Sequence, residues 1–140
     1  MFSPQDFLNF SNDLLKCTSL KKNNGCCRSI ISRSYYAAFL TAREKFDKLD
    51  TMILYHPKHD MHDQVTKALQ ITKYDLQDEF LSDDLVELRT YRIDADYHFP
   101  GACATYERRY RSPKSPELPT TALECYQLAE NIITRVNKLH

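Results

Sequence analysis

Two side chains near the middle of the chain have the chemistry needed to act on a phosphate. The segment from Leu88 to Phe99 reads LRTYRIDADYHF and places Arg92 six positions before His98. Arginine keeps its charge and binds phosphate oxygens with paired donors. Histidine takes up and releases a proton near neutral pH. Breaking a phosphodiester bond without a metal needs both a cation for the phosphate and groups that move protons, so Arg92 and His98 are the candidate catalytic residues.

The spacing of this pair sets a geometric condition. On a straight helix with 3.6 residues per turn, positions six apart point about 120° away from each other and are about 9 Å apart along the axis. The two side chains meet at one phosphate if the helix ends near Tyr97. They also meet if two copies of the chain join these segments across a two-fold axis.

Three further residues of the segment are supporting candidates. Arg89, Arg92 and Asp96 share one helix face because they are separated by three, four and seven positions. We expect a salt-bridge ladder along this face that orients the helix end, in preference to a catalytic role for Asp96. Tyr97 either contacts phosphate or packs in the core, and we expect it to pack.

A basic and aromatic stretch follows the candidate site. Residues 106–114 read YERRYRSPK and include Arg108, Arg109 and Arg111. Arginine contacts phosphates and tyrosine stacks on unpaired bases, so this mixture suits single-stranded RNA. A solvated loop that binds nothing is the alternative.

A metal site is not predicted. His56, His59 and His62 are spaced by three, but Pro57 interrupts any helix face that the three could share. We interpret this stretch as the start of a helix with capping side chains. The sequence predicts no metal and no cofactor.

The elements that must position these residues are predicted to be helices. The chain has two glycines, nine tyrosines and few runs of β-branched residues, which favours helices over a turn-rich β fold. Apolar periodicity and capping residues predict helices over about 4–20, 26–49, from 60 onward, from 83 up to Pro100, and from 120 onward. The second carries one continuous apolar stripe: Cys27, Ile30, Ile31, Tyr35, Ala38, Phe39, Ala42 and Phe46. Residues 1–140 are thus predicted to form a single all-α domain, an antiparallel up-and-down bundle of four to five helices.

Composition adds little about partners. Nineteen Lys and Arg balance nineteen Asp and Glu, so net charge does not indicate nucleic-acid binding. No apolar run is long enough to cross a bilayer, and the amino-terminal residues lack the pattern of a secretory signal. We expect a cytoplasmic protein with no membrane association.

Three segments together resemble one family. Residues 32–43 read SRSYYAAFLTAR, residues 58–62 read KHDMH, and residues 88–98 read LRTYRIDADYH. They are similar, in order, to the S-x-x-Y-Y-A-x-F-x-x-A-R helix, the K-H-S-x-x-H start of the third helix and the L-x-x-x-R-x-x-A-D-Y segment of the HEPN superfamily. The last also fits that family's R-x(4–6)-H signature. HEPN domains are helical domains of prokaryotic toxins and antiviral ribonucleases, and the resemblance covers about the middle two-thirds of the chain.

The resemblance implies a metal-independent endoribonuclease that cuts single-stranded RNA as a homodimer and leaves a cyclic phosphate and a 5′-hydroxyl. It further implies a toxin of a toxin-antitoxin or phage-defence system, with a nucleotidyltransferase-like antitoxin as partner. The alternative is a non-catalytic HEPN module that binds a nucleotidyltransferase or a nucleotide. Ile93 and the position of Tyr97 before His98 favour this alternative, because the better-studied toxins have a polar residue after the arginine and a tyrosine after the histidine. His98 and the arginine-rich stretch favour the nuclease.

Overall fold

The protein is an all-α helical bundle, as predicted. The computed structural model describes residues 1–17, 19, 23–48, 60–76, 78, 80–97 and 118–139. This part of the chain forms five helices and no strand: α1 (Pro4–Lys16), α2 (Asn24–Lys48), α3 (Met61–Leu76), α4 (Leu81–Tyr97) and α6 (Leu118–Asn137). None of these helices is long and apolar enough to span a membrane.

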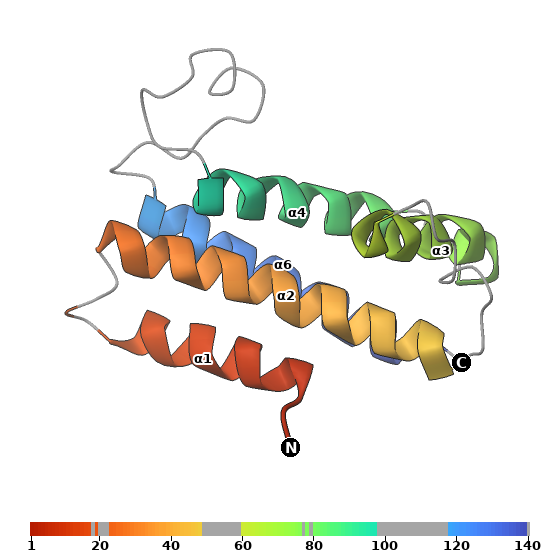
Figure 1. Cartoon of the computed structure of the whole chain (residues 1–140), viewed down its shortest axis with the longest axis horizontal. Coiled ribbons are helices and arrows are strands. Elements are labelled where there is room, and N and C mark those ends of the chain that lie inside the picture. Colours follow the sequence, from red (N-terminus) through yellow and green to blue (C-terminus); the bar gives the residue numbers. More distant parts are fainter. Residues whose placement is uncertain are drawn as a thin grey trace, which may run out of the picture.

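Helix α2 is the central element of the bundle. It contacts α1, α3, α4 and α6, and its contact with α6 is the most extensive. Figure 1 shows α1 and α4 on opposite sides of α2, with α6 behind it and α3 beside α4. Helices α1 and α4 both run in the direction opposite to α2, while α6 runs in the same direction as α2 (Figure 1). The predicted antiparallel arrangement thus holds for the pairs α1–α2 and α2–α4.

Helices α1 and α3 are capped at their N-termini by polar residues that the sequence indicates. The Ser3 N–H donates to the Asp6 carboxylate at 2.8 Å, and Pro4 occupies the first helical position of α1. At the start of α3, the Asp60 carboxylate accepts from the Asp63 N–H at 2.9 Å. Asp60 therefore performs the capping role that was predicted for this stretch.

Several helix boundaries differ from the predictions, and α2 and α4 each begin two residues early, at Asn24 and Leu81. Helix α1 ends at Lys16 and not near Leu20, because Cys17 leaves the helical region with φ −79° and ψ 101°. Helix α6 begins at Leu118, before the threonines that were expected to open it. Helix α4 is described up to Tyr97, and His98, on which the geometric condition depends, lies outside the described residues.

The predicted apolar stripe of α2 lies in the core of the protein, together with buried residues of the other four described helices. All eight of its residues are buried, and Ala37 and Ser34 beside them are fully enclosed. These small side chains allow neighbouring helices to approach α2 closely. Because this stripe is buried, the face of α2 that carries Tyr35 points toward α3 and α4.

Helix α4 places charged residues inside the bundle. Arg92 and Asp94 are buried, with 6% and 2% of their surface exposed. Arg28 of α2 donates to the backbone carbonyls of Asp94 and Ala95 at 3.2 and 3.0 Å, which satisfies acceptors near the end of α4. This bonding ties the last turn of α4 to the first turns of α2.

Candidate functional site

Arg92 lies in a frame of tyrosine rings. Its side chain is 7% exposed, and its guanidinium carbon lies 5.2 Å from the ring centre of Tyr35, 5.5 Å from Tyr36 and 6.0 Å from Tyr97. Such cation–π contacts hold the charge in place without using its N–H donors. We call Arg92 and these three tyrosines the Arg92 site.

The charge of Arg92 is only loosely balanced within the described residues. The Asp96 carboxylate lies 3.7 Å from an Arg92 amino group, which is beyond hydrogen-bond range. The buried Arg92 Nε has no hydrogen-bond partner. Because an unpartnered buried donor is costly, Arg92 keeps the capacity to bind an anion such as a phosphate.

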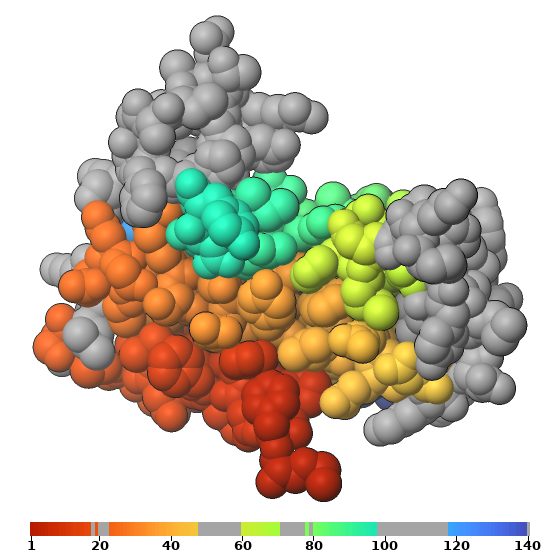
Figure 2. All heavy atoms as spheres, in the orientation of Figure 1, coloured from red at the N-terminus to blue at the C-terminus, as the bar shows by residue number. Residues whose placement is uncertain are grey.

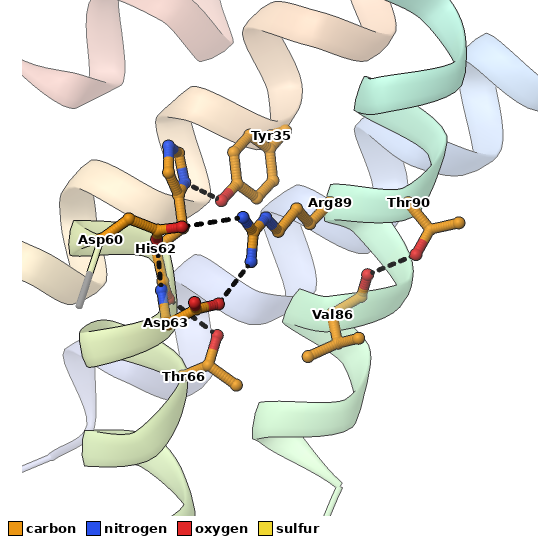
Figure 3. A network of polar contacts seen from close by, with 8 residues as sticks. All are labelled: Tyr35, Asp60, His62, Asp63, Thr66, Val86, Arg89 and Thr90. Carbon is orange, nitrogen blue, oxygen red and sulfur yellow. Dashed lines mark hydrogen bonds and ion pairs between the residues drawn. The ribbon is translucent and has the colours of Figure 1, made fainter. Parts of the chain in front are cut away.

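Part of the predicted salt-bridge ladder is present. The pairing of Arg92 with Asp96 is confirmed, and Ser32 of α2 also donates to the Asp96 carboxylate at 3.2 Å. The predicted pairing of Arg89 along the same helix is wrong. Arg89 instead reaches across to α3, where it binds Asp63 at 2.8 Å and lies 3.6 Å from Asp60 (Figure 3). The acidic first turn of α3 therefore attracts Arg89 more strongly than Asp96 does, because two carboxylates lie within its reach.

His62 is the site residue that sequence reasoning missed. Its Nδ1 is hydrogen-bonded to the Tyr35 hydroxyl, as Figure 3 shows, and its ring stacks on Phe39 with centroids 4.3 Å apart. Sequence spacing grouped His62 with His56 and His59 at a helix start. The bond to Tyr35 joins positions 27 apart, so no local spacing could have revealed it. The K-H-D-M-H segment contains His62, but its resemblance was interpreted only as the start of a helix.

The surroundings of His62 favour its neutral form. Burial lowers the pKa of His62 below its ordinary value, and the charges of Arg89 and Arg92 lower it further, while Asp60 and Asp63 act in the opposite direction. Burial also raises the pKa of the Tyr35 hydroxyl, which stays protonated at neutral pH. The neutral imidazole has one ring nitrogen that donates and one that accepts. It can therefore exchange a proton with a ligand or orient the Tyr35 hydroxyl.

We expect Arg89→Gln to raise the pKa of His62. The substitution removes a positive charge and leaves Asp60 and Asp63 without their partner, and both changes favour the imidazolium. NMR titration of the His62 ring protons measures this pKa. Lys67→Gln, which removes a solvent-exposed charge from the same helix, is the control and should leave the pKa unchanged. A pKa that stays constant or falls in Arg89→Gln would show that Arg89 does not set the protonation of His62.

Tyr97 differs from its predicted role. Its side chain is 68% exposed, so it does not pack in the core as expected. Its ring covers Arg92 from the solvent side at the end of α4, and it is the most exposed of the three rings. Tyr97 is therefore placed to meet a ligand that approaches Arg92.

Four predicted site residues lie outside the described residues: His98, Arg108, Arg109 and Arg111. His56 and His59, which were not predicted to bind a metal, also lie outside them. In the part of the chain that is described, no three His, Cys, Asp or Glu side chains lie close enough to hold a metal ion together. The residues that the structure does bring together come from three helices. They are Tyr35 and Tyr36 of α2, His62 with Asp60 and Asp63 at the start of α3, and Arg89, Arg92, Asp96 and Tyr97 of α4.

Comparison with protein families, with curated proteins and with solved structures gives no match for this chain. Its function is therefore inferred from the chemistry of these side chains and from the segments that carry the HEPN resemblance. Together the side chains offer a buried cation, a neutral imidazole and a protonated phenol. This set can bind a phosphate and move a proton beside it.

Proposed function

We propose that the protein is a metal-independent endoribonuclease that cuts single-stranded RNA and acts as a toxin in a toxin-antitoxin or phage-defence system. One observation carries the proposal. Arg92 is a nearly buried cation, framed by tyrosines on the helix that leads to His98, and the Asp96 carboxylate paired with it lies at 3.7 Å, beyond hydrogen-bond distance. A structural ion pair would ordinarily use the guanidinium donors on a carboxylate at hydrogen-bond distance.

In the proposed reaction, Arg92 binds the scissile phosphate and stabilises the charge that builds up on it. His98 acts as acid or base: the 2′-hydroxyl loses its proton and attacks phosphorus, and the leaving 5′-oxygen gains a proton. The products are a cyclic phosphate and a 5′-hydroxyl. His62 is hydrogen-bonded to the hydroxyl of Tyr35, and the ring of Tyr35 lies 5.2 Å from the guanidinium carbon of Arg92. This arrangement supports the proposal, because it offers a second imidazole in the same region as Arg92.

The deciding experiment is incubation of the purified protein with a mixed single-stranded RNA in excess chelator, with product ends mapped. Cyclic phosphate and 5′-hydroxyl ends that persist in chelator are the expected result. Intact RNA over a range of pH and protein concentrations would exclude the metal-independent nuclease.

The proposed assembly is a homodimer in the cytoplasm, restrained by a nucleotidyltransferase-like antitoxin. A dimer that joins the ends of two α4 helices would bring two copies of the Arg92 site and of His98 together, supplying one histidine as base and one as acid. The motivation is the angular separation of positions 92 and 98, which a shared site would overcome. Light scattering at micromolar concentration tests the dimer.

The arginines after the site are proposed to hold the RNA backbone. Replacing Arg108, Arg109 and Arg111 together with alanine should weaken RNA binding and flatten its salt dependence, because each lost phosphate contact reduces counterion release. Fluorescence anisotropy at several salt concentrations measures both. If affinity and salt slope are the same as in the unaltered protein, these arginines do not contact the substrate.

The competing function is a HEPN module that binds a nucleotidyltransferase or a nucleotide and cuts nothing. The ring contacts of Arg92 favour it in one respect, since cation–π packing also stabilises a helix bundle. Growth inhibition on expression separates the two. If the protein is the nuclease, its expression should inhibit growth, and this inhibition should require His98. If the protein is the binding module, its expression should not inhibit growth.

A further inference from the structure

Asp96 lies beside Arg92 without being hydrogen-bonded to it. An Arg92 amino nitrogen and Asp96 Oδ2 are 3.7 Å apart, although a separation of four positions on a helix allows closer contact. The same carboxylate oxygen accepts a hydrogen bond from the Ser32 hydroxyl of α2 at 3.2 Å. Ser32 therefore ties the carboxylate to α2, next to the guanidinium and short of direct contact with it.

The Asp96 carboxylate lies at the outer edge of the Arg92 site. The Asp96 side chain is 28% exposed, whereas that of Arg92 is 7% exposed. Figure 2 shows the last turns of α4 (blue-green) at the surface next to α2 (orange). Among the described residues, no donor is bonded to the second carboxylate oxygen, Oδ1. A ligand that reaches Arg92 from solvent therefore meets a carboxylate oxygen that can accept a hydrogen bond.

These two opposite charges restrict the kind of ligand that binds here. A phosphodiester has acceptor oxygens and no donor, so it is attracted by Arg92 and repelled by Asp96. A hydroxyl next to the phosphate changes this balance, because it donates to the carboxylate while the phosphate binds the guanidinium. RNA has such a hydroxyl, since the 2′-hydroxyl and the 3′-phosphate are attached to neighbouring carbon atoms of the ribose.

We propose that Asp96 selects ribose over deoxyribose by accepting a hydrogen bond from the 2′-hydroxyl next to the phosphate that Arg92 binds. The inference rests on the proposed function and adds to it the residue that distinguishes RNA from DNA. Asp96 is then a specificity-determining residue, and proton transfer stays with His98. A site that bonds a ligand hydroxyl discriminates against the analogue that lacks it, because the polar group of the site is then left unpaired.

The test uses ligands that share a base and a phosphate and differ only at the 2′ position of the sugar. Wild-type protein is titrated with adenosine 3′-monophosphate, its 2′-deoxy analogue and its 2′-O-methyl analogue, followed by NMR. We expect the ribonucleotide to bind about tenfold more tightly than the deoxy analogue, as one hydrogen bond to a charged group would give. The 2′-O-methyl analogue should bind as weakly as the deoxy analogue, because its 2′-oxygen has no proton to donate.

Asp96→Ala should remove this preference for the ribonucleotide. Asp96→Asn keeps the shape of the side chain and removes its charge, so it should reduce the preference even if Asp96→Ala fails to fold. Glu87→Ala is the matched control, because it removes an exposed carboxylate nine positions earlier on α4, about 180° around the helix. It should keep the full preference. Circular dichroism gives the folded fraction of each variant.

Failure of this inference is distinguishable from failure of the proposed function, because a nucleoside 3′-monophosphate has no bond for a nuclease to cut. If RNA stays intact but the ribose preference is present and depends on Asp96, the inference is upheld and the nuclease is excluded. If RNA is cleaved but the ribonucleotide and the deoxy analogue bind equally, the inference is overturned. An unchanged preference in both Asp96 variants, or no binding of any of the ligands, would also overturn it.

Discussion

Replacing Arg92 with alanine is expected to lower RNA cleavage by about a hundredfold or more, as removal of a single preorganised donor to a transition-state charge does. His98→Ala should cause a loss of the same order by removing an acid or base. The measurement is single-turnover cleavage of a labelled single-stranded RNA, expressed per folded molecule. Arg92 is buried under tyrosine rings, so its loss also affects stability, and the folded fraction must be measured for each variant.

Arg92→Lys is the matched control for charge. Lysine keeps the positive charge but lacks the planar fork that binds two phosphate oxygens at once and stacks on tyrosine. Its cleavage rate should lie between those of the wild type and Arg92→Ala. Full cleavage per folded molecule in Arg92→Ala would contradict the phosphate role. Full cleavage and toxicity in His98→Ala would leave the binding module as the better description.

Truncating Tyr35 should produce the largest loss of stability among the residues that contact Arg92. Tyr35 is 1% exposed, and removing a buried aromatic ring costs about 3 kcal/mol of the free energy of unfolding or more. The ring also covers Arg92 and its hydroxyl bonds to His62, so Tyr35→Ala damages the core and the site together. Urea denaturation measures the first effect and RNA cleavage the second.

Two further variants separate these effects. Tyr35→Phe keeps the ring against Arg92 and removes the hydroxyl, which should cost about 1 kcal/mol of stability because His62 loses its partner. Phe46→Ala should destabilise the protein as strongly as Tyr35→Ala, since Phe46 is fully buried in the same helix. Its cleavage should fall only as its folded fraction falls. If Phe46→Ala lost cleavage while folded, loss of activity could not be assigned to the site.

The fold was predictable because its signals are local. The apolar stripe of α2 repeats at helical spacing, Ser3 and Pro4 mark the start of α1, and the four-residue separation of Arg92 and Asp96 places them on one face. What spacing cannot supply is the direction of a long side chain between two helices. Arg89 could reach Asp96 on its own helix or Asp63 on α3, and only the packing of α3 beside α4 decides between them.

The same limit explains why His62 was missed and Tyr97 was misplaced. His62 contacts Tyr35 because two helices meet, although nothing in the spacing around either residue indicates the contact. Tyr97 was expected to pack in the core in preference to contacting phosphate. It lies at the last described position of α4, and its side chain faces solvent.

The position of α3 at the edge of the bundle has a consequence for how the protein loses activity. Helix α3 packs on α2 and α4, whereas the most extensive contacts in the protein join α2 to α6 and α1. Opening of α3 alone exposes less apolar surface than global unfolding and therefore costs less free energy. Such an opening removes His62, Asp60 and Asp63 from Tyr35 and Arg89 while the remaining helices stay packed. Warming should thus inactivate the protein reversibly at temperatures where most of its helical signal persists.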